Sequence, residues 1–149
     1  VNFDNYYQND HKLEGTKIVT NEGRNQEQNL VYSTVINDGI VITPEQKSIS
    51  YQESTQRVWV EGENTFLDAC DDVYMVSGSQ SGISSDEINY SLSIIEDLNV
   101  KVCCHWIRSG ILNVDIETIP TISINYGEGE CDNTATITIL ENDYPIIME

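Results

Sequence analysis

Apolar and polar residues alternate along much of the chain with a period of two, which is typical of β-strands. The alternation is clearest over Ile88–Ile95, where apolar side chains occupy every even position and Asn or Ser occupies the odd positions up to Ser93. The segment Val100–Ser109 alternates in the same way. No segment has the 3.6-residue period of a helix over a useful length. The pattern therefore predicts an all-β protein.

Turn-forming residues divide this pattern into short strands. Asn37-Asp38-Gly39 separates two apolar runs and predicts a hairpin turn, because Asn and Gly tolerate the positive φ that such turns need. The Gly- and Ser-rich stretch 78–85 predicts a turn after a strand over 72–77, and 141–143 predicts the turn of a final hairpin. Closely spaced strands form sequential hairpins, so we expect an antiparallel meander of about ten strands in a barrel-like or sandwich domain.

The length of the chain, 149 residues, suits a single domain. Residues 1–15 are polar and lack periodicity, so we expect an extended N-terminal lead-in there and one β domain over 16–149. No apolar run is long enough to span a membrane.

The chain is strongly acidic, with 25 Asp and Glu against 7 Lys and Arg and a net charge of −18. Such a surface repels phosphate backbones and anionic head groups, so nucleic acid is not an expected partner. We interpret most of this charge as a solvated surface that keeps the protein soluble. A sharper alternative is a calcium site at Glu128, Glu130 and Asp132, whose carboxylates would point to the same side of an extended segment. We expect no other cofactor.

Four cysteines, Cys70, Cys103, Cys104 and Cys131, suggest two disulfides formed in an oxidising compartment. Three pairings are open. If Cys103 and Cys104 lie in one strand they point to opposite faces, which favours Cys104–Cys131 and Cys70–Cys103. A zinc site is the alternative. However, Cys103, Cys104 and His105 are consecutive, and three consecutive residues cannot all bind one tetrahedral ion.

No catalytic constellation stands out, so we do not expect an enzyme. The chain has only two histidines that could act as a general base. The stretch 78–82 resembles the Gly-x-Ser-x-Gly nucleophile elbow of hydrolases, but Gln80 stands where the nucleophilic Ser would be.

Two Trp–Arg pairs are the candidate ligand-binding residues, Trp59 with Arg57 and Trp106 with Arg108. In each pair the spacing of two residues puts both side chains on one face of a strand. Exposed Trp rings would suit sugar rings, with Arg for polar contacts. The competing interpretation is core Trp with Arg covering the rim.

Three segments carry a family resemblance: 71–78 (DDVYMVSG), 104–110 (CHWIRSG) and 125–135 (NYGEGECDNTA). They resemble the motifs D-D-x-Y-x-[IV]-[ST]-G, C-x-W-[IV]-x-S-G and D-Y-G-x-G-x-C-D-N-x-A-T of a family of uncharacterised secreted proteins and lipoproteins of Bacteroidota, over about residues 16–149. Asn125 stands where that family usually has Asp, and Cys70 and Cys103 look like an added pair.

The resemblance implies export to the surface of a Gram-negative bacterium, often with a lipid anchor that would lie upstream of Val1. We therefore expect an extracellular, surface-anchored, non-enzymatic β domain. It would act as an accessory or interaction subunit, with a protein partner in an outer-membrane or cell-surface assembly. The alternative is a carbohydrate- or Ca²⁺-binding module for surface glycan capture.

Overall fold

The computed structural model describes residues 1–65 and 67–148. Within them it has ten strands and one short 3₁₀ helix, η1 (Ala69–Asp71). The strands are β1 (Asn2–Gln8), β2 (His11–Arg24), β3 (Leu30–Ile42), β4 (Ser48–Glu61), β5 (Val73–Ile83), β6 (Asn89–Lys101), β7 (Ser109–Ile116), β8 (Ile119–Glu128), β9 (Thr134–Ile139) and β10 (Asn142–Ile147). No helix in these ranges is long and apolar enough to cross a membrane.

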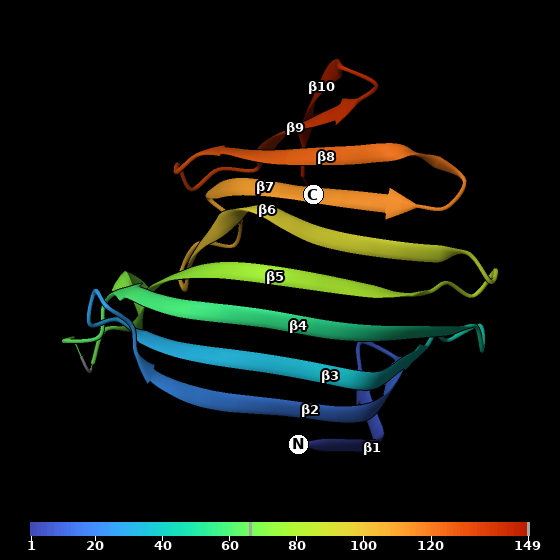
Figure 1. The fold of residues 1–149 in the computed structure, drawn as a ribbon, viewed down its shortest axis with the longest axis horizontal. Coiled ribbons are helices and arrows are strands. Elements are labelled where there is room, and N and C mark those ends of the chain that lie inside the picture. The colour runs from blue at the N-terminus through green and yellow to red at the C-terminus, as the bar shows by residue number, and fades with distance from the viewer. Residues whose placement is uncertain (66, 149) are drawn as a thin grey trace.

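The strands form one open antiparallel sheet in the order of the sequence, from β1 to β10 (Figure 1). This confirms the all-β class, the antiparallel meander and the expected number of strands. The edge strands β1 and β10 lie at opposite ends of the sheet, so it has the curvature of part of a barrel without closing.

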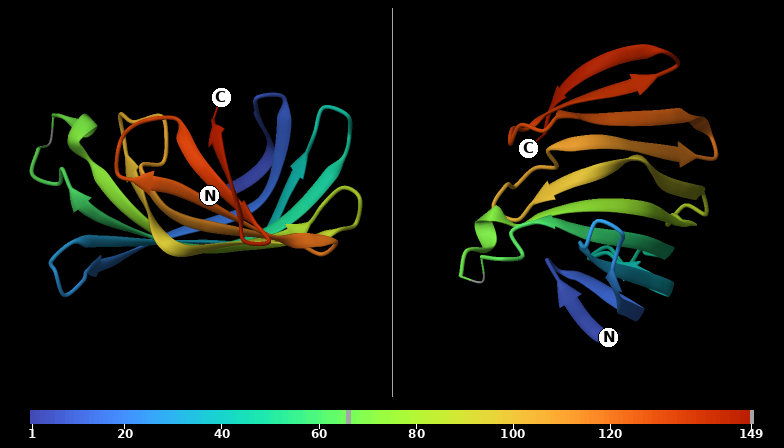
Figure 2. Two further views of the ribbon diagram at one scale, coloured as in Figure 1. Left: turned by 90° about the horizontal axis from the view of Figure 1, so that it is seen from above. Right: turned by 60° about the vertical axis from the view of Figure 1, so that its left-hand side comes forward.

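The sheet is bent into a gutter, because most of its hairpin ends rise on one side, whereas the hairpin between β2 and β3 points the other way (Figure 2). Register shifts within the long strands contribute to this shape. They occur between Ile36 and Gly39 in β3, and between Val76 and Ser79 in β5. A bulge bends its strand and increases the local twist, and wide twisted sheets curl.

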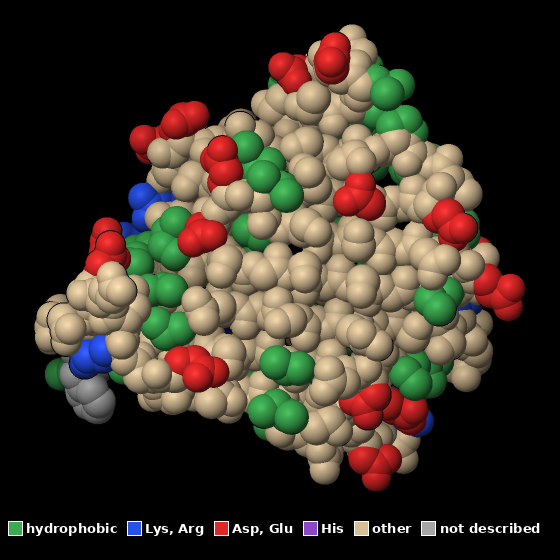
Figure 3. Space-filling model, viewed as in Figure 1, with side chains coloured by type: hydrophobic (Ala, Val, Ile, Leu, Met, Phe, Trp, Pro, Cys, Tyr) green, Lys and Arg blue, Asp and Glu red, His purple; other side chains and the backbone are tan. Residues whose placement is uncertain are grey.

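The outer face of the gutter is largely polar, although an apolar row, Val31–Val58–Met75, crosses it at one end of β3 to β5. Residues paired across antiparallel strands share a face. One row of such pairs crosses the sheet from β4 to β10, and all its side chains are uncharged and polar except the last, which is acidic. Its members are Ser54, Ser79, Ser93, Asn113, Ser123, Thr138 and Asp143. The face seen in Figure 3 is accordingly dominated by uncharged polar side chains and backbone, with acidic side chains near its margins. Water can solvate this face directly.

The inner face is apolar from β6 to β9. Two neighbouring rows there consist only of aliphatic side chains. They are Leu92–Val114–Ile122–Ile139 and Ile94–Leu112–Ile124–Ile137. Several of these residues, with Leu98, line a shallow hollow, which places them on the concave side. Leu98 is buried, whereas the eight row members all keep part of their surface in water.

The expected hairpin at Asn37-Asp38-Gly39 is wrong, because β3 runs through it. Ile36 and Gly39 pair with Glu53 and Tyr51, so β3 carries one extra residue there as a bulge. The Asp38 carboxylate accepts a hydrogen bond from the Thr16 amide (3.0 Å), which ties the bulge to β2. The turn-forming residues at 37–39 therefore form a bulge within β3 and do not reverse the chain.

The expected turn over 78–85 lies mostly inside β5. Gly82 pairs with Tyr51 on one side and Tyr90 on the other, so backbone ladders on both edges override its poor strand propensity. The actual turn follows, closed by a hydrogen bond from the Ser84 amide to the Ile88 carbonyl (2.9 Å).

Residues 1–15 do not form a lead-in ahead of the sheet. They contribute β1 and the first part of β2, joined by a two-residue turn in which Asn9 and Asp10 have φ of 50° and 64°. Positive φ at both central residues is the geometry that lets a tight hairpin follow the strand twist. The aperiodic side chains of β1 are largely exposed at the sheet edge, so they give no apolar alternation to detect.

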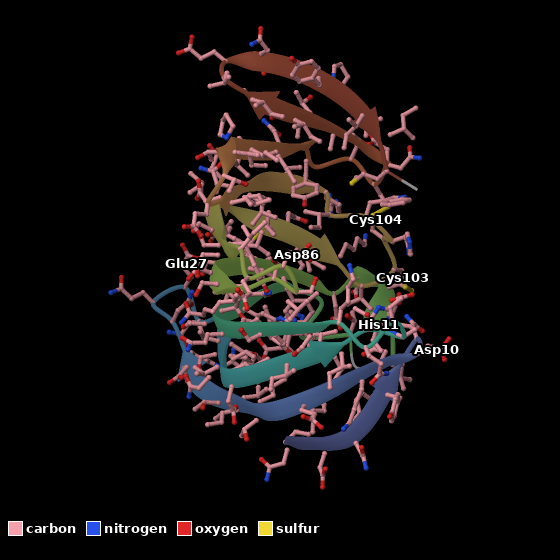
Figure 4. All side chains as sticks on the ribbon, turned by 90° about the vertical axis from the view of Figure 1, so that its right-hand side faces the viewer. Asp10, His11, Glu27, Asp86, Cys103 and Cys104 are labelled. Carbon is pink, nitrogen blue, oxygen red and sulfur yellow. A yellow bond between two sulfur atoms is a disulfide. The ribbon has the colours of Figure 1, made fainter. Side chains whose placement is uncertain are left out.

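Both expected disulfides are present, Cys70–Cys103 and Cys104–Cys131. Cys103 and Cys104 do not lie in a strand, so the expectation that they point to opposite faces of one strand is wrong. β6 ends at Lys101, and the two cysteines lie in the connection to β7 (Figure 4). Cys103 fastens that connection to η1, and Cys104 fastens it to the segment after β8.

A comparison of two glycines tests the close approach of β2 to the β3 bulge. Both Gly15 and Gly23 have positive φ, but a Cβ at Gly15 would lie 2.5 Å from the Asp38 carbonyl oxygen, whereas one at Gly23 would meet nothing within 4 Å. We expect Gly15→Ala to lower the free energy of unfolding by at least about 1 kcal/mol more than Gly23→Ala, as measured by urea denaturation. Equal losses would show that only φ strain matters.

A second prediction concerns the two disulfides. Their sequence separations of 33 and 27 residues imply similar chain-entropy contributions, about 3–4 kcal/mol each. Cys104 is 9% exposed, so the double variant Cys104→Ala/Cys131→Ala also leaves a cavity. We expect it to lose more unfolding free energy than Cys70→Ala/Cys103→Ala in urea titrations. The opposite order would contradict the assigned roles.

Candidate functional site

Strands β2 to β5 form a hollow of about 250 Å³ on the inner face. Its lining combines two cations, three aromatic rings and two smaller side chains. The residues are Lys17, Arg57, Tyr32, Trp59, Tyr74, Val19 and Thr34. The register brings them together, because Tyr32 pairs with Arg57, and Trp59 pairs with Tyr74.

Trp59 and Tyr74 form the aromatic wall of this hollow. Their ring centroids lie 5.6 Å apart at an interplanar angle of 26°, a stacked arrangement between neighbouring strands. The indole N–H of Trp59 is buried and has no hydrogen-bond partner among the described residues. Trp59 and Tyr74 both line the hollow with part of their surfaces.

The electrostatics of the hollow differ from those of the whole chain. Neither Lys17 nor Arg57 forms a salt bridge within the described residues, where Lys12 pairs with Glu14 and Arg24 with Glu63. Burial raises the pKa of Tyr74, Asp72 raises it further, and Arg57 acts in the opposite direction. The Tyr74 hydroxyl therefore stays protonated at neutral pH and can donate.

The second Trp–Arg pair lies elsewhere. Trp106 and Arg108 are in the connection between β6 and β7, where the His105 ring meets Trp106 edge to face at 4.7 Å. The Arg108 Nε–H donates to the Gly129 carbonyl (2.6 Å), and the Gly129 amide donates to the Arg108 carbonyl (2.9 Å). Arg108 therefore holds the segment after β8 beside the Cys104–Cys131 disulfide.

The three acids of the expected calcium site are not brought together by this structure. In residues 1–65 and 67–148, no three His, Cys, Asp or Glu side chains are placed to hold a metal ion. Glu128 ends β8, and Gly129 has a φ of 120°, so the segment is not continuously extended. The Asp132 carboxylate instead accepts hydrogen bonds from the Thr134 amide (2.9 Å) and hydroxyl (2.7 Å).

A larger inner-face hollow, of about 480 Å³, lies at the other ends of β3 to β6. Tyr51 lies across Gly39, where a Cβ would come within 2.5 Å of its ring, and Tyr90 lies across Gly82. The sequence pattern does not mark these tyrosines as site residues, nor Lys17, Tyr32 and Tyr74. Single-strand patterns carry no register, so the only available signal was the aromatic content of the strands.

The fold and its two disulfides define the class of this protein, a disulfide-stapled single-sheet β protein. Comparisons with protein-family models, with curated proteins and with solved structures found no match.

The hydrogen bonds to Asp132 give a testable pH dependence. They lower the pKa of its carboxyl group, mainly through the Thr134 hydroxyl and then its amide. A lowered folded-state pKa means that these bonds stabilise the fold above the ordinary Asp pKa, and that this contribution is lost as the pH falls through the lowered value. We expect Thr134→Val to move the Asp132 pKa up towards its ordinary value in a carboxyl NMR titration.

The matched control for this titration is Thr138→Val. The Thr138 hydroxyl donates to Asp143 (2.7 Å) and belongs to a different pair. The Thr138→Val variant should therefore leave the titration of Asp132 unchanged. An unaltered Asp132 pKa in Thr134→Val would contradict the assigned cause.

Proposed function

We propose that this chain is an extracellular, non-enzymatic β domain that acts as an interaction subunit of a cell-surface assembly. The observation that carries the proposal is the aliphatic patch, defined as Leu98 together with the two inner-face rows across β6 to β9. An antiparallel sheet ordinarily packs one face against a core and leaves the other to water. Here no second layer covers the apolar face within the described residues.

The exposed area supports an uncovered interface. The accessible surface is 9733 Å², whereas a compact monomer of this mass would expose about 7,600 Å². The excess of about 2,000 Å² is more than the roughly 800 Å² that each partner buries in a standard interface. This excess belongs to the whole open sheet, and the partly exposed aliphatic patch would form the apolar centre of a larger interface that includes its surroundings.

Charge favours a basic protein partner over a second copy of this chain. The patch carries no charge, while acidic side chains lie around the molecule, including Glu27 and Asp86 at hairpin turns (Figures 3 and 4). Two copies, each with a net charge of −18, would repel one another at the rims. A partner with a convex aliphatic surface flanked by Lys and Arg satisfies both the patch and the rim.

The two disulfides support a location outside the cytosol, since such bonds persist in oxidising compartments. Together with the motif resemblance, they favour the outer surface of a Gram-negative cell, with a lipid anchor upstream of Val1 where one is present.

Site-specific photo-cross-linking in cells that make the protein tests this function. Leu112 and Asn113 are neighbours in β7 but lie on the inner and outer faces. We expect a benzoylphenylalanine at 112 to join one distinct polypeptide, through a segment that is aliphatic with basic flanks. The same residue at 113 should give at least about tenfold less of this adduct.

Three outcomes would overturn the proposal. They are equal adducts from 112 and 113, an adduct at 112 only with another copy of this chain, and no adduct at 112 in intact cells. Protease treatment of those cells checks the location separately, because a surface protein is cleaved without lysis.

A further inference from the structure

Two of the seven basic residues of this very acidic chain meet in one place. Lys17 and Arg57 both line the hollow formed by β2 to β5, and its described lining contains no Asp or Glu. Two acids lie nearby, Glu53 in the same pairing row as Lys17 and Asp72 close enough to raise the Tyr74 pKa, but neither carboxylate lines the hollow. The hollow is therefore a cationic spot in an anionic molecule.

Aromatic rings complete this cationic spot. The stacked Trp59 and Tyr74 form one wall, and Tyr32 lies beside Arg57 in the pairing across β3 and β4. Arg57 is exposed, and Lys17, Tyr32 and Trp59 keep part of their surface in water. A molecule arriving from solvent can thus reach both the charges and the rings.

We infer that this hollow binds an acidic sugar residue, a pyranose ring that bears a carboxylate or sulfate. The apolar face of a sugar ring packs on Trp and Tyr rings, and Lys and Arg form charge-assisted hydrogen bonds with the anionic group. The hollow of about 250 Å³ is smaller than the roughly 300–1,000 Å³ of sites for drug-sized ligands, so it suits one ring of a longer chain.

This site is separate from the proposed protein interface. The hollow lies over β2 to β5, whereas the aliphatic patch spans β6 to β9. A sugar chain could therefore be held while the patch is covered. The inference does not rest on the protein partner, and either proposal can fail alone.

Three probes separate ring recognition from charge recognition. Methyl β-D-glucuronide has both a ring and a carboxylate, methyl β-D-glucoside has the ring alone, and acetate has the charge alone. We expect the glucuronide to shift the backbone NMR signals of Lys17, Arg57 and Tyr74 in a saturable titration. The other two probes should bind at least about tenfold more weakly, since each lacks one of the two contacts.

Variants of the two cations test the assignment of residues. Arg57→Gln and Lys17→Gln should each weaken glucuronide binding about tenfold, as expected for loss of a charge-assisted hydrogen bond. Lys47→Gln removes an equal charge from the exposed turn between β3 and β4 and should change nothing. The NMR spectrum away from the hollow confirms that each variant is folded.

The inference is overturned if the glucuronide does not bind or if it binds no better than the glucoside. It is also overturned if Arg57→Gln and Lys17→Gln bind the glucuronide like the parent protein, or if Lys47→Gln weakens binding as much as they do. That last result would mean that the charge acts only at long range.

Discussion

An open sheet of ten strands, whose edge strands β1 and β10 do not pair with each other, cannot enclose its own apolar face. Backbone ladders between consecutive strands hold the sheet together, but a core needs a second layer against which side chains can pack. Only six apolar side chains are buried among the described residues, and most inner-face residues remain partly exposed. The curvature, the stapled connections and the distribution of polar side chains all follow from this constraint.

The two disulfides compensate for this small core at one end of the sheet. Cys104 is among the few buried residues, and its bond to Cys131 works together with the hydrogen bonds between Arg108 and Gly129. Cys103 ties the same connection to η1. This connection thus becomes a fixed element without belonging to any strand, and a staple of this kind stabilises a domain whose core contributes little.

The inner face has two chemically different regions. Over β6 to β9 it is aliphatic and uncharged, which suits a protein surface that excludes water. Over β2 to β5 it presents rings and cations, which suits a small anionic ligand. The outer face is different again, because a long row of Ser, Asn and Thr side chains crosses it from β4 to β9 and can be solvated directly. Recognition is therefore expected on the concave side, by two mechanisms that do not compete for the same residues.

The sequence by itself determined the all-β class, the meander and the approximate number of strands, because alternation and turn residues are local properties. The cysteine count indicated two disulfides. The structure has the expected pairing, but the connection between β6 and β7 decides it and not the two faces of one strand. The sequence also marked Trp59 and Arg57 as ligand candidates. Only the tertiary structure decided the register. Register made Asn37-Asp38-Gly39 a bulge, kept Gly82 inside β5 and brought β1 into the sheet. It also placed Lys17 and Tyr74 beside Trp59 and aligned the aliphatic rows on one open face. A strand's own residues do not specify which residues of its neighbours lie opposite, so these groupings arise only when the ladders form.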